Sequence, residues 1–506
     1  MNLPLITRAE KNSEKRAILT DEGAFTYQDL LHISSQIATS LLNETADLQE
    51  QRVAFLIPPG FEYVATQWGI WRAGGIAVPL CISHPRPELE YVITNSGASM
   101  IIAHPNFEDI LRAIATTHNL RFILTTEPLG DHVAPLPEID ITRRALILYT
   151  SGTTGKPKGV VTTHQNIQAQ VTSLVTAWEW TTSDSLSQTL SDRILHILPL
   201  HHIHGIINVL TCALWAGAEC HMLSKFDADV VWKRISQGEF TLFMAVPTIY
   251  VKLIAAWENA SQERQKTMTA GCTKMRLMVS GSAALPVQVL QKWQNISGHF
   301  LLERYGMTEI GMALSNPLHG QRYAGYVGQP LPQVEVRLVD EDGNLVPLGT
   351  PGEIQVKGPG VFLEYWQNPQ ATAKAFQDGW FCTGDLAVVE NGNYRILGRM
   401  SVDIIKTGGY KVSALEIEEV LRTHPDIQEC AVVGVDDPEW GERVCAALVL
   451  QPQRQLTLES FRSWAKEQLA VYKVPTKILL VEELPRNAMG KVTKPTVVEL
   501  FRGSSL

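Results

Sequence analysis

Short runs of apolar residues alternate with amphipathic stretches along the first third of the chain. Each run is four or five residues long, which is the usual length of a buried strand. Between the runs, apolar positions recur at helical spacing, as in the stretch that ends near Leu42. Strands that alternate with helices predict parallel α/β layers. The expected strands are Val53–Ile57, Ile76–Leu80, Met100–Ala103, Phe122–Thr125 and Ala145–Leu148.

The pattern changes near residues 334–357. Val334–Val339 and Gly352–Lys357 alternate apolar and polar residues around a turn at Asp340–Gly343. This arrangement predicts antiparallel hairpins, as in a small barrel or a distorted sheet. After Arg399 the chain returns to an α/β pattern of about a hundred residues, near the usual size of a domain.

The length of 506 residues is too great for one hydrophobic core. We therefore predict an α/β protein of two domains. Residues 1–399 are expected to form a large domain of layered sheets with helices and a small β-rich part. Residues 400–506 are expected to form a small α+β domain, with the junction at Met400–Ser401.

Composition and charge exclude some classes of function. A hydrophobic content of 45% and a charged content of 19% are typical of a globular enzyme. The net charge of −9 leaves no basic stripe, so we expect no nucleic-acid partner. Even the apolar stretch 194–214 is interrupted by four histidines, so we expect no membrane span. The pattern does not indicate an oligomeric state.

The cysteines and the chain ends indicate a compartment. Seven cysteines are scattered without CxxC spacing, which favours reduced thiols over disulfides or a zinc site. The first residues lack the apolar core of a signal peptide. The terminal tripeptide Ser504–Leu506 lacks the central lysine of a peroxisomal signal. We therefore expect a cytoplasmic protein.

The segment Tyr149–Gly159 carries the strongest chemical signal. It holds three glycines, four Ser/Thr hydroxyls and two lysines directly after an apolar strand. Glycines let successive N–H groups point into one concavity, and hydroxyls and ammonium groups add donors and positive charge. The segment therefore predicts a polyphosphate site, although a Gly/Ser/Thr surface turn has a similar composition. Its spacing and Pro157 rule out a Walker A loop.

Four further blocks follow this loop in order. They are Glu303–Glu309, Trp380–Asp385, Gly398–Lys411 and Pro485–Lys491. Together with the loop, they resemble the adenylate-forming superfamily, which contains acyl-CoA synthetases, adenylation domains of peptide synthetases and beetle luciferases. The resemblance spans nearly the whole chain. It implies a large N-terminal domain, a mobile C-terminal lid and an active site between them.

The resemblance implies an ATP site with Mg²⁺ as cofactor. Glu309 and Thr153 hold the Mg²⁺, and one carboxylate beside phosphate oxygens suits this ion. Tyr305 lies near the adenine, Asp385 accepts hydrogen bonds from the ribose hydroxyls, and Arg399 supports the ribose or the phosphates. The remaining ATP-binding residues implied are Thr150, Ser151, Gly152, Thr154, Gly155, Lys156, Lys158, Gly281, Ser282, Ala283, Gly306, Met307 and Thr308.

Two further sets of residues concern the two half reactions. Lys491 bridges the carboxylate and the α-phosphate during adenylation, where a cation stabilises the developing negative charge. The lid then rotates, and Gly408 and Gly409 line the passage for coenzyme A. His202 matches the gate between the acyl pocket and this passage. Many relatives carry Asp or Lys where this chain has Ser401, so the pivot residue differs.

Among these relatives, the chain is most similar to malonyl-CoA synthetases, through blocks 198–205, 279–286 and 302–309. Arg304 is a guanidinium before the Tyr-Gly motif and suits bidentate binding of a carboxylate. The malonate-binding arginine that follows Val-Pro-Thr-x-Tyr-x in that family is Lys252 here, which keeps the charge but loses the planar fork.

The resemblance implies an ATP-dependent acyl-CoA synthetase for malonate or a similar short dicarboxylate, with AMP and pyrophosphate as products. If Lys252 instead reaches solvent beside a neutral pocket, the substrate is a medium-chain or aromatic monocarboxylate. A stand-alone adenylation enzyme that loads a carrier protein is a further alternative, and so is a luciferase-type oxygenase.

Overall fold

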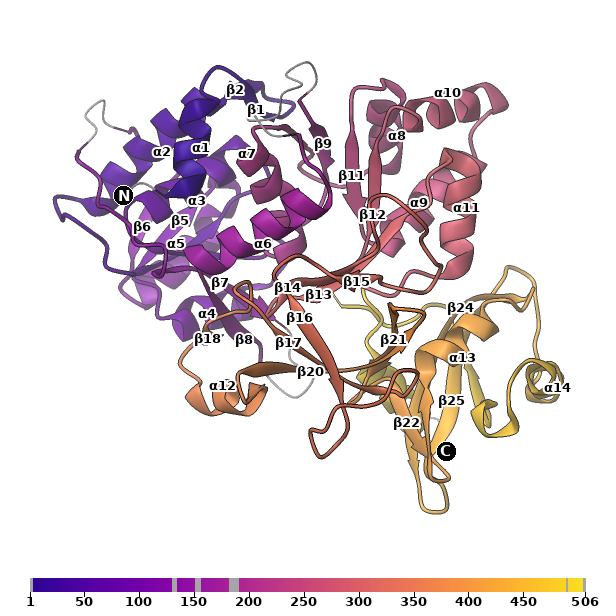
Figure 1. Ribbon diagram of the computed structural model, residues 1–506. Helices are drawn as coiled ribbons and strands as arrows, with labels where there is room; N and C mark the ends of the chain where they lie inside the picture. The colour runs from indigo at the N-terminus through magenta and orange to yellow at the C-terminus, as the bar shows by residue number, and fades with distance from the viewer. Residues whose placement is uncertain (1–2, 130–133, 151–155, 182–190, 488–489, 504–506) are drawn as a thin grey trace. The chain divides into compact units, whose positions relative to one another are not determined.

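The structure is a computed structural model that describes residues 3–129, 134–150, 156–181, 191–487 and 490–503 (Figure 1). The chain divides into two compact units. The first comprises residues 1–322, 328–335 and 356–381, and the second comprises 323–327, 336–355 and 382–506. The predicted boundary at residue 399 lies inside the second unit, and the division into domains 1–399 and 400–506 stays a prediction.

The first unit contains two large sheets, and each has a parallel centre (Figure 1). The sheet of seven strands has the order β18 (Glu364–Tyr365), β8 (Lys158–Thr163), β7 (Arg144–Thr150), β4 (Ile76–Pro79), β3 (Arg52–Leu56), β5 (Met100–Ala103) and β6 (Arg121–Leu124). All five strands expected from the apolar runs lie in this sheet. The prediction of parallel α/β layers is therefore confirmed.

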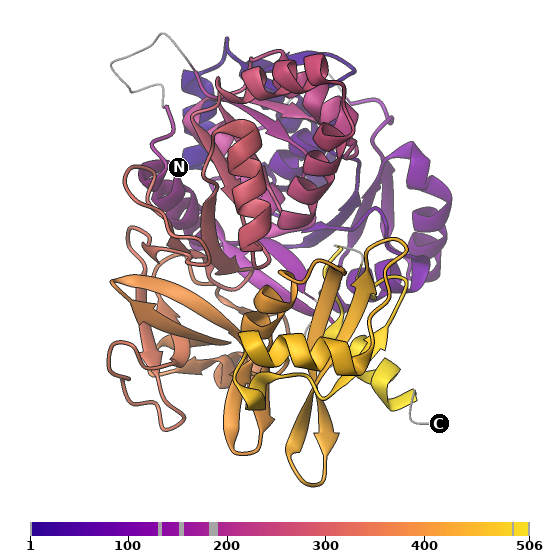
Figure 2. The same cartoon turned by 90° about the vertical axis from the view of Figure 1, so that its right-hand side faces the viewer.

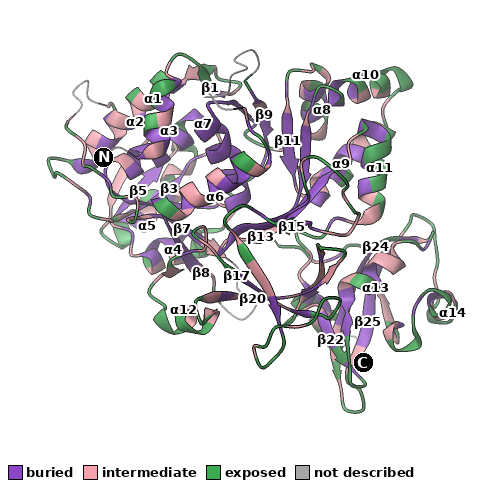
Figure 3. Cartoon of the chain, in the orientation of Figure 1, coloured by how far each residue is buried: buried purple, intermediate pink, exposed green. Residues whose placement is uncertain are grey.

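The second sheet of this unit has nine strands. Its order is β15 (Gln329–Pro330), β14 (Gly311–Ser315), β13 (Leu302–Met307), β12 (Leu277–Ser280), β11 (Leu242–Ala245), β9 (Arg193–His196), β10 (Glu219–Met222), β1 (Arg16–Leu19) and β2 (Ala24–Thr26). The central strands are buried along their length (Figure 3). Strand β13 carries most of the block Glu303–Glu309, so this block has a rigid support.

Helices flank both sheets of the first unit, and α8 to α11 gather beside β11 and β12 (Figures 1 and 2). Helix α2 follows the predicted pattern and ends at Leu42. It begins after Thr26, which forms a capping box with Asp29. The helices are α1 (Pro4–Lys11), α2 (Tyr27–Leu42), α3 (Phe61–Arg72), α4 (Arg86–Ser96), α5 (Glu108–Thr117), α6 (His164–Ala177), α7 (Cys212–Ala216), α8 (Ala228–Ser236), α9 (Pro247–Glu258), α10 (Gln262–Cys272), α11 (Val287–Ser297) and α12 (Pro369–Ala375).

Antiparallel pairs predominate in the two sheets of the second unit. The strands at residues 334–357, where the alternating pattern predicts hairpins, are neighbours in one of these sheets. One sheet pairs β20 (Trp380–Glu390) with β21 (Asn393–Arg399) and includes β16 (Glu335–Val339) and β17 (Gly352–Lys357). Its strand β19 (Phe376–Gln377) belongs to the first unit. The other has the order β23 (Tyr410–Ser413), β22 (Ile404–Thr407), β25 (Gly441–Leu450) and β24 (Ile427–Asp437), with β26 (Lys477–Leu480) beside β25. The helices of the α+β part are α13 (Ala414–Leu421), α14 (Leu458–Gln468) and α15 (Lys494–Gly503).

Two further features concern the helices and the cysteines. Within the described ranges, no helix combines the length and the apolar character that crossing a bilayer requires. All seven cysteines carry free thiols.

Candidate active site

The predicted phosphate loop joins two antiparallel strands. Strand β7 ends at Thr150, which pairs with Lys158 at the start of β8. The Lys156 ammonium lies 5.3 Å from the ring centroid of Tyr91, whose hydroxyl donates to the Pro157 carbonyl at 2.9 Å. The structure therefore anchors the loop at both ends. The predicted phosphate donors Ser151, Gly152, Thr153, Thr154 and Gly155 lie outside the described residues.

Glu309 lies beside this hairpin. Its side chain is buried, and Oε1 accepts a hydrogen bond of 2.9 Å from the hydroxyl of Tyr365. The ring of Tyr365 in turn lies 5.0 Å from the Lys158 ammonium. The fold thus brings together Lys158 and Glu309, which are 151 residues apart in the sequence (309 − 158 = 151). Sequence reasoning missed Tyr365, because a tyrosine in a two-residue strand gives no recognisable pattern.

The carboxylate of Glu309 suits a hard divalent cation. It offers an oxygen held in place by Tyr365, beside the loop with Lys156 and Lys158. Magnesium favours such a site, with one or two carboxylates and phosphate oxygens as ligands. The residues present therefore fit the predicted ion. In the described ranges, no group of three His, Cys, Asp or Glu side chains forms a metal-binding cluster.

Strand β13 carries the next predicted residues. Tyr305, Gly306 and Met307 are half-buried at its end, and Thr308 follows. A side chain at Gly306 would place its Cβ 2.0 Å from the carbonyl oxygen of Gly311, so only glycine permits this close approach.

The small-residue loop after β12 lies beside the same strand. Gly281 is buried, and Ser282 adopts a positive φ of 71° and shares a 3.2 Å hydrogen bond with Nδ1 of His204. Ala283 is exposed. A Cβ on Gly281 would lie 2.5 Å from Nε of Arg304, so this glycine gives the guanidinium its space.

Arg304 is a buried charged residue of the first unit. Its side chain is only 3% exposed, and burial lowers its pKa to about 9, so it still carries a proton at pH 7. Its Nε and Nη2 have no hydrogen-bond partner among the described residues. A buried charge without a partner costs several kcal/mol, of the order found when a buried ion pair loses one member. The position therefore suits a negatively charged ligand.

Lys252 has a different environment. The residue is exposed on α9, and its ammonium lies 5.7 Å from the ring centroid of Phe226. The two cations expected to bind one carboxylate thus differ in burial. Of the two, Arg304 has the greater need of a counter-charge, because water already solvates Lys252.

The predicted gate residue His202 is half-buried, and its ring centroid lies 4.1 Å from that of His201. The next turns form a π-helix over His204–Thr211, a geometry that is frequent at functional sites. Nε2 of His196 lies 3.0 Å from the carbonyl oxygen of Gly205 in this helix. His202 therefore lies just before an irregular helix, and a hydrogen bond with His196 of strand β9 holds that helix in place.

In the second unit, Asp385 and Arg399 face each other on β20 and β21. The guanidinium contacts both carboxylate oxygens, at 2.8 and 3.1 Å. The backbone N–H of Arg399 also donates to Asp403 at 3.0 Å, and Asp403 pairs with the buried Lys494 at 2.6 Å. Sequence reasoning predicted Asp385 and Arg399 and missed the support from Asp403 and Lys494.

The remaining predicted residues lie in exposed loops of the second unit. Gly408 and Gly409 form the turn between β22 and β23 with φ of 55° and 81°, which favours glycine. Lys491 is exposed in a loop whose backbone is held by Asn487 through two hydrogen bonds of 2.9 and 3.0 Å.

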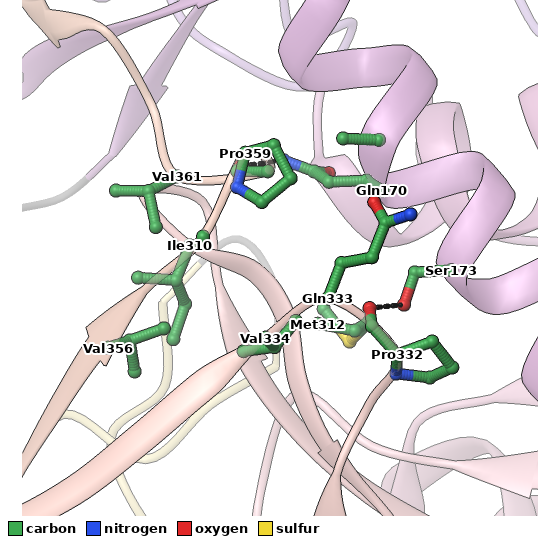
Figure 4. Close-up of a pocket in the computed structure, with 13 residues that line it drawn as sticks. Gln170, Ser173, Ile310, Met312, Pro332, Gln333, Val334, Val356, Pro359 and Val361 are labelled. Atoms are coloured by element: carbon green, nitrogen blue, oxygen red, sulfur yellow. Dashed lines mark hydrogen bonds between the residues drawn. The ribbon is translucent and has the colours of Figure 1, made fainter.

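A small cavity of the first unit has none of the predicted site residues in its lining (Figure 4). Its lining includes Gln170, Ile310, Met312 and Val361, and Ser173 donates to the Pro332 carbonyl at 2.8 Å. Its volume of about 10 Å³ is at the limit for one water molecule. A space of this size does not hold an organic acid or a nucleotide.

Comparisons with known proteins show the family of the chain. Residues 5–366 match the AMP-binding enzyme family, and residues 416–491 match the AMP-binding enzyme C-terminal domain. A mitochondrial malonate–CoA ligase of Xenopus laevis is 45% identical over 99% of this chain and 92% of its own length. A malonate–CoA ligase of Arabidopsis thaliana is 39% identical over 96% of this chain and 86% of its own. The ATP-bound structure of MatB from Rhodopseudomonas palustris superimposes with a TM-score of 0.89, at 33% identity and 99% coverage of both chains.

Proposed function

The chain belongs to the family of AMP-binding enzymes and is an AMP-forming acid–CoA ligase, and from this premise we propose that its acid is malonate. The reaction joins malonate to AMP with release of pyrophosphate, and coenzyme A then displaces AMP to give malonyl-CoA. Two relatives named as malonate–CoA ligases support this choice of acid.

The observation that carries the proposal is the buried guanidinium of Arg304. Malonate keeps one carboxylate after the other has reacted, and this group needs a cation that water does not already solvate. Arg304 is 3% exposed and presents N–H donors without partners in the described part of the chain. A planar guanidinium suits a carboxylate in bidentate geometry. A neutral acyl chain leaves this charge uncompensated, which argues against a monocarboxylate.

The first half reaction brings two anions together. We assign Lys156 and Lys158 to the phosphates, and Lys491 to the negative charge that develops between the attacking carboxylate and the α-phosphate. Glu309 would hold Mg²⁺, which neutralises phosphate charge when it is bound. Tyr365 positions that carboxylate, and the paired Asp385 and Arg399 are assigned to the ribose.

The second half reaction needs a thiol to attack the mixed anhydride. We assign His202 to the gate between the acyl group and the thiol, and Gly408 and Gly409 to the passage of the pantetheine arm. A turn with φ of 55° and 81° presents backbone without side chains, which suits a narrow passage.

The experiment that tests the acid is pyrophosphate release measured across matched acids, with and without coenzyme A. We expect kcat/KM for malonate to exceed that for propionate by about a hundredfold or more, because a site built for a charged group rejects the analogue that lacks it. Preference for hexanoate or benzoate would contradict malonate as the substrate. Release of pyrophosphate without any malonyl-CoA product would instead indicate a carrier protein as the acceptor.

Replacement of Tyr365 by phenylalanine tests the support of Glu309. The ring beneath Lys158 remains, but the donor to the carboxylate is lost, and such a bond to a charged group contributes about 1.5–3 kcal/mol. We expect kcat/KM to fall by roughly tenfold or more, and more steeply at low Mg²⁺ concentration. Tyr326→Phe is the matched control, since it removes a similar bond to Glu390. Equal effects of the two variants would contradict the assignment.

The cytoplasmic location and the absence of a nucleic-acid partner stay proposals. They rest on the net charge and the scattered thiols, whereas the Xenopus laevis relative is named as mitochondrial. Cell fractionation of the full chain tests the location, and enrichment with mitochondria would overturn it.

A further inference from the structure

Helix α4 contacts both ends of the segment predicted to bind phosphate. Tyr91 and Asn95 are one turn apart on α4, so they lie on the same face of the helix. The hydroxyl of Tyr149, near the end of strand β7, donates to Oδ1 of Asn95 at 2.7 Å. The hydroxyl of Tyr91 donates to the carbonyl of Pro157 at 2.9 Å. One helix face therefore holds the chain both where the segment begins and where it ends.

The helix itself is fixed by packing. Its buried face shares one apolar cluster with Ile147 of β7 and Val161 of β8, and α4 lies beside these strands in Figure 1. The rings of Tyr91 and Tyr149 meet edge to face, with their centroids 6.2 Å apart. Burial raises the pKa of both tyrosines, so both hydroxyls keep their protons and remain donors.

The ring of Tyr91 has a second contact with the same segment. The Lys156 ammonium lies 5.3 Å from its centroid, which is within the range of a cation–π interaction. An aromatic ring attracts an ammonium but has no net charge, so the lysine keeps its whole charge and its N–H donors for an anion. A carboxylate in the same place would neutralise the lysine. Tyr91 therefore orients this cation without cancelling its charge.

We propose that Tyr91 and Asn95 are positioning residues of the phosphate site. Tyr91 fixes the ammonium of Lys156 and the carbonyl of Pro157, and Asn95 fixes Tyr149 at the other end of the segment. The inference rests on the proposed assignment of Lys156 to the phosphates of ATP. Both residues act through a neighbour. Groups held in place before a ligand arrives lose less entropy when it binds, so the effect belongs to the affinity for polyphosphate.

The test is inhibition of AMP formation by two probes, tripolyphosphate and adenosine, with whichever acid the enzyme uses best. Tripolyphosphate reports the phosphate site, and adenosine reports the rest of the nucleotide site. Tyr91→Leu should raise the inhibition constant for tripolyphosphate by about tenfold and leave that for adenosine within about twofold. Phe122→Leu is the matched control, because it removes a ring 4.4 Å from the Arg112 guanidinium in the same sheet. It should change neither constant.

Two milder variants separate the contacts. Tyr91→Phe keeps the ring beside Lys156 and loses only the hydrogen bond to Pro157, so it should raise the tripolyphosphate constant by about threefold. Asn95→Leu removes the acceptor for Tyr149 and should raise the same constant by about threefold. An unchanged constant in both of these variants would overturn the proposal, even if Tyr91→Leu does not fold.

Lys156→Met separates this inference from the assignment on which it rests. If Lys156→Met leaves the tripolyphosphate constant unchanged, the phosphate assignment and this inference are both wrong. If Lys156→Met raises the constant and Tyr91→Leu does not, only this inference is overturned. An equal rise of the tripolyphosphate and adenosine constants in Tyr91→Leu would indicate a general loss of structure, and it would also overturn the proposal.

Discussion

Replacement of Lys491 by alanine is expected to lower the rate of acyl-adenylate formation by about a thousandfold, as the loss of one preorganised donor to a developing charge does. The ammonium contributes where the carboxylate attacks the α-phosphate, and this negative charge exists only in the first half reaction. Transfer from preformed malonyl-AMP to coenzyme A should therefore stay within about threefold of the unmodified rate. Pyrophosphate release reports the first step, and thioester formation from synthetic malonyl-AMP reports the second.

The matched control is Lys466→Ala, which removes an exposed lysine of α14 in the same unit. It should leave both half reactions unchanged. Lys491 is itself exposed, so its replacement should not change the thermal unfolding temperature. An equal loss in both half reactions would contradict the assignment of Lys491 to adenylation alone.

Replacement of Arg304 by methionine is expected to lower kcat/KM for malonate. The corresponding loss of transition-state stabilisation is roughly 2–5 kcal/mol, the range for truncating one member of a buried charge pair. The carboxylate of the bound acid would then lie in a buried site without a counter-charge. Propionate should be used as well as before or better, because the unpaired guanidinium no longer opposes a neutral chain. Initial rates with the two acids at several concentrations give both values of kcat/KM.

The thermal unfolding temperature of the Arg304→Met variant is an independent test of this assignment. Methionine has a similar length and needs no solvation, and replacing buried charge by apolar volume is often neutral or stabilising. The variant should therefore unfold at the same temperature or a higher one, although it loses malonate activity. Lys252→Met is the matched control and should change kcat/KM for malonate far less, because Lys252 is exposed. A larger loss from Lys252→Met than from Arg304→Met would contradict the proposed carboxylate site.

Much of the fold could be predicted from local patterns in the sequence. The apolar runs at residues 53–57, 76–80 and 100–103 became buried strands, because an uninterrupted apolar run can only be satisfied inside a sheet covered on both faces. Thr26 and Asp29 mark the start of α2 through a capping box, which needs only neighbouring residues. The order of the motifs identified the family without any coordinates.

Other features depended on contacts between distant segments. The sequence of the loop at 149–159 predicts a strand before it, but the antiparallel partner β8 is determined by pairing across the turn. Tyr365 holds Glu309 only because β18 pairs with β8, and no local pattern indicates that. The support that Asp403 and Lys494 give to Arg399 arises in the same way.

The sequence by itself determined the chemical class, because five motifs carry residue types and spacings that one reaction needs. The sequence predicts both Arg304 and Lys252 as partners of one carboxylate. Only the tertiary structure showed that Arg304 is buried away from water and that Lys252 is exposed to it. Solvation and charge depend on what surrounds a side chain in space, and neighbours in space are set by packing and not by order along the chain.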